Sequence, residues 1–165
     1  YLLEEDKNLV KSVSCTTRAP RDGEENGREY FFISEREFRS RIQENDFLEY
    51  DEHFGNYYGT PRSFVERQLK DRSVILEIDV VGALNAKRLM PDKTVLVMVT
   101  PPSMEELENR LSGRGSESEE QKRDRLQRVR YELEQAHLYD YVLVNDDSRQ
   151  TKIKIQEIIR REKEK

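Results

Sequence analysis

Three largely apolar runs constrain the fold of this sequence more than any other feature. They cover residues 73–80 (SVILEIDV), 94–99 (TVLVMV) and 141–144 (YVLV). Apolar strands that alternate with helices are typical of parallel strands buried on both faces. The runs therefore predict an α/β fold with a doubly wound parallel sheet. The helices expected between and after them cover residues 81–89, 103–111, 119–137 and 148–162.

The stretch 17–72 has a different pattern, because its predicted strands are short and alternating. These strands cover residues 29–33, 47–50 and 57–59. A helix is expected from Ser34, a suitable N-cap, to about Glu44. This stretch is therefore predicted to be a small mixed α/β subdomain inserted into the parallel core. The alternating segment 9–16 ahead of it is predicted to form one strand.

Composition limits the classes of function. The 165 residues fit one domain, and their net charge of −5 is opposite to the basic face that nonspecific nucleic-acid binding needs. No apolar run approaches the roughly 20 residues that cross a bilayer, and no signal peptide is expected. The single cysteine, Cys15, cannot form an internal disulfide. We expect a cytoplasmic protein that binds neither nucleic acid nor a membrane.

Side chains that suit a phosphate ligand follow a predicted strand, and open parallel sheets bind ligands beyond the carboxyl ends of their strands. Arg18 and Arg21 lie three residues apart directly after the segment 9–16. Two guanidinium groups can bind and neutralise a nucleotide phosphate, although a solvated charged loop is the alternative. The tyrosines can donate hydrogen bonds to phosphate oxygens, or they can be partly buried core residues. They are Tyr30, Tyr57 and Tyr58.

Three acidic side chains are further candidates. Glu49 can accept hydrogen bonds from the N1–H and the amine of guanine, a donor pair that adenine lacks; a surface glutamate is the alternative. Glu77 and Asp79 share one face of the predicted strand 73–80, where an unpaired charge would be costly to bury. They need a partner such as an arginine, a hydrated magnesium ion or ligand hydroxyls, and for Asp79 a structural ion pair is the alternative.

The segment Gly113-Arg114-Gly115 places an arginine on a flexible loop, as in lids that close over transferring phosphates. Four more arginines follow on the next predicted helix, most of them expected in solvent: Arg123, Arg125, Arg128 and Arg130. The two histidines have no metal-ligand spacing with Cys15, so no zinc site is expected.

Five collinear segments resemble the guanylate kinase family over essentially the whole chain. They are 12–32 (SVSCTTRAPRDGEENGREYFF), 47–65 (FLEYDEHFGNYYGTPRSFV), 75–83 (ILEIDVVGA), 101–118 (PPSMEELENRLSGRGSES) and 139–147 (YDYVLVNDD). The resemblance implies one domain with a P-loop kinase core (1–16, 73–111, 129–165), a GMP-binding subdomain (17–72) and a helical lid (112–128). It also implies transfer of the γ-phosphoryl group of ATP to GMP or dGMP, with Mg²⁺ bound to the ATP.

The family's functional positions carry over residue by residue. The resemblance implies that guanine is read by Ser14, Glu49 and Thr60 with support from Asp79, and that the GMP phosphate is bound by Arg18, Arg21, Tyr30 and Tyr58. On the ATP side it implies Arg110, Arg114, Arg125, Asn145 and Asp146, of which Arg114 and Arg125 are the catalytic lid arginines. Glu77 and Asp79 fall near the magnesium ion, which they would reach through water.

The sequence departs from the family in one respect. Family members begin with a strand and a phosphate-binding loop, Gly-x-x-x-x-Gly-Lys-[Ser/Thr], and these 165 residues do not contain that pattern. We expect about 20 further residues with this loop before Tyr1 in the natural polypeptide, and we expect the chain as given to be inactive. The alternative function is a non-catalytic guanylate-kinase-like scaffold module that binds phosphopeptides. Such modules typically lose the arginine-bearing lid that this sequence retains.

Overall fold

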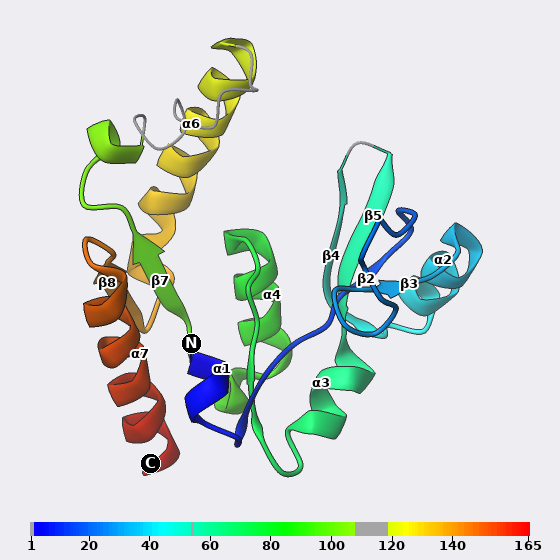
Figure 1. The fold of residues 1–165 in the computed structure, drawn as a ribbon, viewed down its shortest axis with the longest axis horizontal. Helices are drawn as coiled ribbons and strands as arrows, with labels where there is room; N and C mark the ends of the chain where they lie inside the picture. The colour runs from blue at the N-terminus through cyan, green and yellow to red at the C-terminus, as the bar shows by residue number, and fades with distance from the viewer. Residues whose placement is uncertain (1, 54, 108–118) are drawn as a thin grey trace. The chain divides into compact units, whose positions relative to one another are not determined.

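The computed structural model describes residues 2–53, 55–107 and 119–165. The chain divides into two compact units, Tyr1–Thr94 and Val95–Lys165, each described here by itself (Figure 1). The first unit contains, in chain order, α1 (Leu2–Glu5), β1 (Leu9–Lys11), β2 (Cys15–Thr16), β3 (Phe31–Phe32), α2 (Glu35–Gln43), β4 (Phe47–His53), β5 (Asn56–Pro61), α3 (Arg62–Gln68), β6 (Ser73–Ile75), α4 (Val80–Leu89) and the 3₁₀ turn η1 (Pro91–Lys93). The second contains β7 (Val97–Thr100), a helical turn at 104–107, α6 (Glu119–Glu134), η2 (Gln135–Leu138), β8 (Tyr141–Val144) and α7 (Ser148–Lys163).

Parallel strand pairs occur in both units. In the first unit β1 pairs with β6, with Leu9 opposite Ser73 and Lys11 opposite Ile75. In the second unit β7 pairs with β8, from Val97 opposite Tyr141 onward. Parallel pairs joined through helices confirm the predicted α/β class.

The predicted strands 73–80 and 9–16 differ most from the structure. The run 73–80 forms strand only at Ser73–Ile75, so the acidic residues of that run follow the strand instead of ending it. The segment 9–16 was expected as one strand, and this was wrong. The chain leaves β1 at Lys11, and β2 begins at Cys15 in a different sheet. The backbone N–H of Ser12 still donates to the carbonyl of Ile75, which completes the β1–β6 ladder before the chain crosses over.

A four-stranded sheet, in the order β3-β2-β5-β4, joins three strands of the region predicted as an inserted subdomain to β2, which directly precedes it. Helix α2 packs on one face of it through Phe38, whose ring is fully buried. The Phe38 ring stacks on the rings of Phe47 and Tyr57, with centroid-to-centroid distances of 4.4 and 5.2 Å. Cys15, also fully buried, lies in the same cluster. This aromatic stack is the hydrophobic core that fixes α2 against the sheet.

The ends of α2 agree with the sequence prediction. The Ser34 side chain accepts a hydrogen bond from the backbone N–H of Glu37, as an N-cap does. After the C-cap at Glu44, Asn45 takes a φ of 55°, the left-handed conformation that commonly ends a helix. Local sequence therefore determines both limits of this helix.

The hairpin of β4 and β5 turns next to Gly55, which has a φ of +73°. The register shifts between Phe47 and Glu49, which indicates a bulge. Beyond the shift Glu49 lies opposite Thr60 and Asp51 opposite Tyr58. Because successive side chains on a strand point to opposite faces, Tyr57 packs on the Phe38 core, whereas Tyr58 and Thr60 point to the other face.

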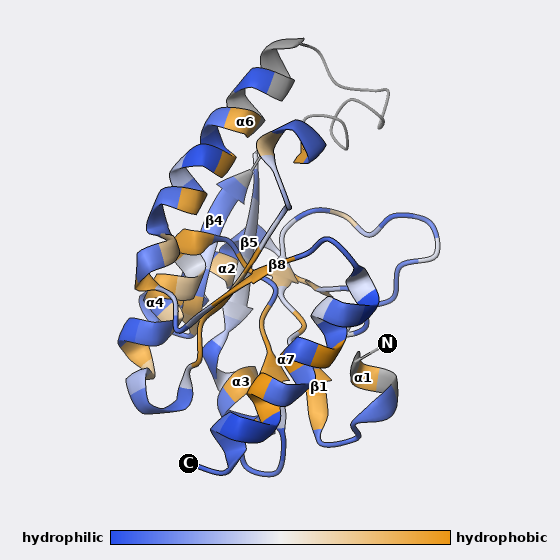
Figure 2. Ribbon diagram, turned by 90° about the vertical axis from the view of Figure 1, so that its left-hand side faces the viewer, coloured by the Kyte–Doolittle hydropathy of each residue, from blue (hydrophilic) through white to orange (hydrophobic). Residues whose placement is uncertain are grey.

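In the second unit, the side chain of Asp147 caps α7 by accepting from the N–H groups of Arg149 and Gln150. Figure 2 shows hydrophobic stretches along β8 and part of α7, whereas α6 is largely hydrophilic. Within the residues that the structure describes, no helix has the length and apolar character to cross a membrane.

The Phe38 stack generates a stability prediction. Replacing Phe38 by Ala should lower the free energy of unfolding by about 3–5 kcal/mol, because the change leaves a cavity between Phe47 and Tyr57. Urea denaturation followed by circular dichroism measures the loss. Phe38→Leu keeps most of the buried volume and should cost clearly less. Equal midpoints for the Ala variant and the parent would contradict a core centred on Phe38.

Candidate functional site

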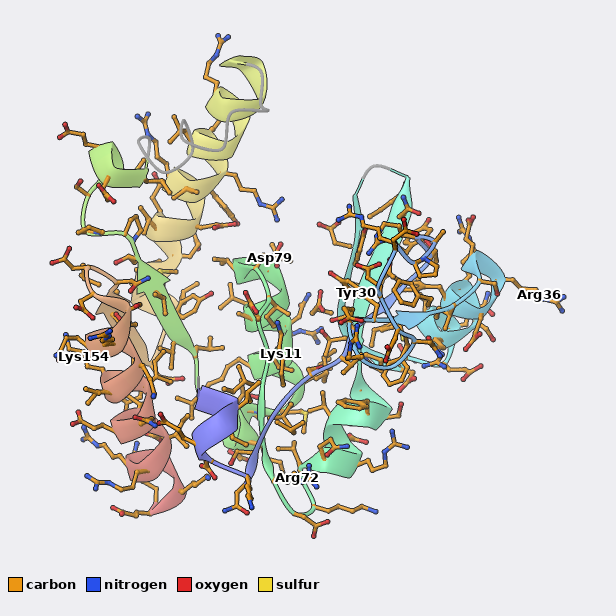
Figure 3. All side chains as sticks on the ribbon, in the orientation of Figure 1. Lys11, Tyr30, Arg36, Arg72, Asp79 and Lys154 are labelled. Atoms are coloured by element: carbon orange, nitrogen blue, oxygen red, sulfur yellow. The ribbon has the colours of Figure 1, made fainter. Side chains whose placement is uncertain are left out.

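The residues predicted to bind a nucleoside monophosphate all lie in the first unit, around the face of the sheet opposite the Phe38 core. They form two adjacent groups, because Tyr58 and Thr60 are alternate residues of β5 and so share one face. Tyr58 belongs to a group with Arg18 and Tyr30. Thr60 belongs to a group with Glu49 at the start of α4. Figure 3 marks Tyr30 beside the strands and Asp79 at the start of α4.

Arg18 is the centre of the first group. Its guanidinium lies over the rings of Tyr30 and Phe32, at 5.7 and 5.8 Å from the ring centroids. The rings of Tyr30 and Tyr58 meet edge to face at 5.9 Å. A hydrogen bond to the Glu24 carboxylate, and to a smaller degree the Tyr58 hydroxyl, raise the pKa of Arg18. A permanently charged guanidinium beside two phenol groups can bind a dianionic phosphate.

Arg21 and Ser14 lie in the chain segments that flank β2. The Arg21 side chain is exposed, and its backbone N–H donates to the Glu24 carboxylate. The half-buried Ser14 accepts a hydrogen bond at its carbonyl from the N–H of Phe31 at the start of β3. Arg21 is therefore tied to the Glu24 side chain in the loop after β2, and Ser14 is tied to the backbone of β3.

Glu49 is the centre of the second group. Its carboxylate accepts a hydrogen bond of 2.5 Å from the hydroxyl of Thr60, which is fully buried. Burial raises the pKa of Glu49, and the nearby charge of Asp79 raises it further, whereas the Thr60 hydrogen bond acts in the opposite direction. A carboxylate that is removed from water and fixed by one donor is suited to accept further hydrogen bonds from a ligand.

The first turn of α4 lies directly against Glu49. Asp79 is the N-cap of this helix, and its side chain accepts from the N–H of Gly82 at 2.8 Å. A Cβ atom at position 82 would come within 2.9 Å of Cγ of Glu49, so only glycine allows this approach. Gly82 was not among the site residues predicted from the sequence. The signal was a glycine inside a predicted helix, which costs about 1 kcal/mol relative to Ala and so calls for a packing reason.

The two acids of the run 73–80 have separate surroundings. Glu77 is largely exposed, and its carboxylate pairs with the ammonium group of Lys11 at 2.7 Å. Asp79 caps α4. Both follow β6 at the carboxyl end of the β1–β6 pair, where a ligand is expected.

Carboxylate oxygens suit Mg²⁺, which usually keeps several waters in proteins. Within the described ranges, no three His, Cys, Asp or Glu side chains are grouped to hold a metal ion directly. The two carboxylates that follow β6, Glu77 and Asp79, are oxygen donors of the kind that Mg²⁺ accepts, and their contact with the ion through water stays a prediction.

The predicted ATP-side residues are only partly described. Asn145 directly follows β8, and its side-chain oxygen accepts from the hydroxyl of Thr151, while the neighbouring Asp146 is exposed. Arg125 lies on α6, and the structure describes its backbone alone. Arg110 and Arg114 lie outside the described residues.

Two residues weighed from the sequence take no part in this face. Tyr57 points to the opposite face of β5, where its hydroxyl accepts from Arg39 at 3.0 Å. Cys15 is a buried strand residue, as expected, and burial raises the pKa of its thiol to about 11. A thiol with so high a pKa is a poor nucleophile at neutral pH.

Comparison with known proteins decides the family. The guanylate kinase family model matches residues 1–162. The chain belongs to the guanylate kinase family. It is 46% identical over 163 residues to the guanylate kinase of Caldanaerobacter subterraneus subsp. tengcongensis, covering 98% of this chain and 79% of the relative. It is 44% identical to the guanylate kinase of Wolbachia sp. subsp. Brugia malayi, covering 98% and 84%.

A solved structure has the same fold. The chain superposes on the crystal structure of guanylate kinase from Anaplasma phagocytophilum with a TM-score of 0.78, at 37% sequence identity over 99% of this chain and 79% of the other. This match and the parallel strand pairs confirm the predicted α/β fold of the P-loop kinase type.

The Thr60–Glu49 contact generates a pH-dependent prediction. Replacing Thr60 by Val should lower the free energy of unfolding at neutral pH by about 1–3 kcal/mol, because an ionised carboxylate in a buried site loses its donor. It should also raise the pKa of Glu49 further. The loss of stability should therefore shrink as the pH falls through that pKa and the carboxyl becomes neutral.

Urea denaturation across the acidic range, with a ¹³C NMR titration of the Glu49 carboxyl, tests this prediction. Thr16→Val is the matched control, since it removes a buried hydroxyl that donates to the carbonyl of Tyr57 instead of to a carboxylate. The loss of unfolding free energy caused by Thr16→Val should not depend on the ionisation of Glu49. Parallel pH profiles for the two variants would contradict the assignment.

Proposed function

We propose that this protein is a guanylate kinase that transfers the γ-phosphoryl group of ATP to GMP or dGMP, giving ADP and GDP or dGDP. The observation that carries the proposal is the half-buried Glu49 carboxylate, fixed by Thr60 on the sheet face that also presents Tyr58. Family membership supports the same reaction. An acceptor for guanine and an arginine for the phosphate, present in one site, together specify GMP more narrowly than either group does by itself.

Guanine recognition follows from the hydrogen-bonding capacity of Glu49. Its carboxylate accepts from Thr60 through Oε1 and retains lone pairs for the N1–H and amine of guanine. Adenine presents an unprotonated N1 at the same position, which an ionised carboxylate repels. Ser14 and Thr60 complete the guanine site in this proposal, and Asp79 supports it through α4.

The GMP phosphate is bound, in this proposal, by Arg18, Arg21, Tyr30 and Tyr58. Arg18 and the two tyrosine rings are already in contact without a ligand. A site that is formed in advance loses less conformational entropy on binding. The subdomain that carries these residues corresponds to residues 17–72.

The ATP side of the proposal rests on the family pattern. Arg110, Asn145 and Asp146 would hold the adenine base, and the lid at 112–128 would bring the catalytic Arg114 and Arg125 to the phosphates. Mg²⁺, bound with ATP, would offset the charge of the phosphate oxygens, and Glu77 and Asp79 would contact it through water. Transfer is direct and in line, so the protein's part is to orient both nucleotides and stabilise charge.

The proposal extends to partners and location. The substrates are small nucleotides, with no role for nucleic acid or a membrane, and the location is cytoplasmic. A phosphopeptide-binding scaffold could use Arg18, Tyr30 and Tyr58 but has no use for a guanine acceptor. The buried Glu49–Thr60 contact therefore favours the enzyme. Turnover of ATP and GMP by the complete natural protein, followed by coupled detection of ADP and GDP, tests the reaction directly.

The Glu49 site predicts the acceptor. GMP and dGMP should be phosphorylated, and AMP should have a kcat/KM lower by roughly 5- to 150-fold, because adenine lacks the two donors that guanine offers to the half-buried Glu49 carboxylate. Glu49→Gln should weaken this preference, and Glu52→Gln on the same strand is the control. Comparable turnover of AMP and GMP by the parent protein would contradict the guanine assignment.

The division of roles predicts a second pattern. Arg21→Ala and Tyr58→Phe should each weaken GMP binding by roughly ten-fold while ATP affinity changes little, because each removes a donor to the GMP phosphate. Arg114→Ala should instead lower kcat with little effect on GMP affinity. Calorimetric GMP titrations and steady-state kinetics of the three variants measure this. Normal GMP binding by Arg21→Ala would refute the phosphate assignment.

A further inference from the structure

Glu24 links the two arginines of the phosphate site through a single carboxylate. Its two oxygens accept from Nη2 of Arg18, at 2.9 and 3.0 Å. One of them, Oε2, also accepts from the backbone N–H of Arg21 at 2.7 Å. The backbone N–H of Glu24 donates back to the carbonyl of Arg21 at 3.0 Å. One side chain therefore closes the loop between the two arginines.

The Arg18–Glu24 pair is more sheltered than an ordinary surface ion pair. The two side chains are only 16% and 17% exposed, whereas Arg28 and Glu25 in the same loop are 54% and 70% exposed. The rings of Tyr30 and Phe32 lie beneath the guanidinium. The hydrogen bonds from Arg18 and from the Arg21 N–H lower the pKa of Glu24, so the carboxylate stays ionised throughout the neutral range.

These contacts leave Arg18 able to bind a ligand. A guanidinium has five N–H donors; Nη2 donates to Glu24, Nη1 donates to the Ala19 carbonyl, and the Tyr58 hydroxyl is a further hydrogen-bond partner of the group. A phosphate can approach while the bond to Glu24 is kept. Holding a long side chain in its binding geometry before the ligand arrives reduces the entropy lost on binding.

We propose that Glu24 is a positioning residue for GMP, which holds Arg18 and the backbone of Arg21 in the geometry that binds the phosphate. This inference rests on the proposed function. In the competing role, the Glu24 carboxylate takes the place of the phosphate and is displaced by it. The two roles predict opposite signs: a positioning residue increases GMP affinity, and a displaced substitute decreases it.

The test is Glu24→Gln in the complete natural protein. The amide removes the charge and cannot accept from Arg18 and from the Arg21 N–H as a carboxylate does. The Kd and KM for GMP should rise about five- to ten-fold, while kcat at saturating GMP and the KM for ATP stay within about two-fold. Glu24→Asp keeps the charge, so its Kd and KM for GMP should lie between those of the parent and those of Glu24→Gln.

Glu29→Gln is the matched control, because Glu29 also bridges a guanidinium, that of Arg28, and a backbone N–H, that of Glu25, in the same loop. It should leave GMP affinity unchanged. Guanosine supplies the second control, because it lacks the phosphate. Its inhibition constant should be the same for the parent and for Glu24→Gln, whereas general loosening of the site would weaken guanosine as well.

Each outcome decides the inference. Weaker GMP binding with unchanged guanosine binding supports positioning by Glu24. Tighter GMP binding overturns it in favour of a displaced carboxylate, and unchanged GMP binding or an equal loss for guanosine also overturns it. If the parent protein neither binds nor phosphorylates GMP, the proposed function fails and this inference fails with it. If the parent phosphorylates GMP normally and only the Glu24 result differs, the inference alone fails.

Discussion

The alternation of side chains along β5 is the constraint on which the rest of the first unit depends. Tyr57 stacks on Phe38 and so fixes the sheet against α2. That contact obliges the neighbouring residues Tyr58 and Thr60 to point to the other face, where they meet Tyr30 and Glu49. A shift of one residue in this register would place the site residues in the core and the core residues in solvent. Core and site are therefore two faces of one strand.

Carboxylates organise the candidate site, although its proposed ligands are anions. Glu49 and Asp79 lie around the start of α4, and Glu24 lies in the loop after β2. Each accepts hydrogen bonds from fixed donors: a threonine hydroxyl, a helix N–H, or an arginine with a backbone N–H. Fixed donors allow negative charge to be kept close to a nucleotide site without leaving it unpaired. The same arrangement orients the groups that would contact the nucleotide.

Residues with local signals could be placed from the sequence. Ser34 caps α2 because its hydroxyl accepts from an N–H three residues on, and the YVLV run forms β8 with the predicted bounds. The chain between Lys11 and Cys15 could not be placed in this way. An alternating pattern is the same whether the strand stays in one sheet or crosses to another, and only pairing with β6 and β5 determines the break.

The sequence by itself determined the α/β class and the types of side chain available for a nucleotide, because periodicity and chemistry are written in consecutive residues. Only the tertiary structure decided which of them meet. The Thr60 hydroxyl reaches Glu49 across the hairpin because the register places those residues opposite each other. The close approach of Gly82 to Glu49 depends on how α4 packs against β4. Such contacts arise from strand pairing and burial between distant segments, which no local pattern specifies.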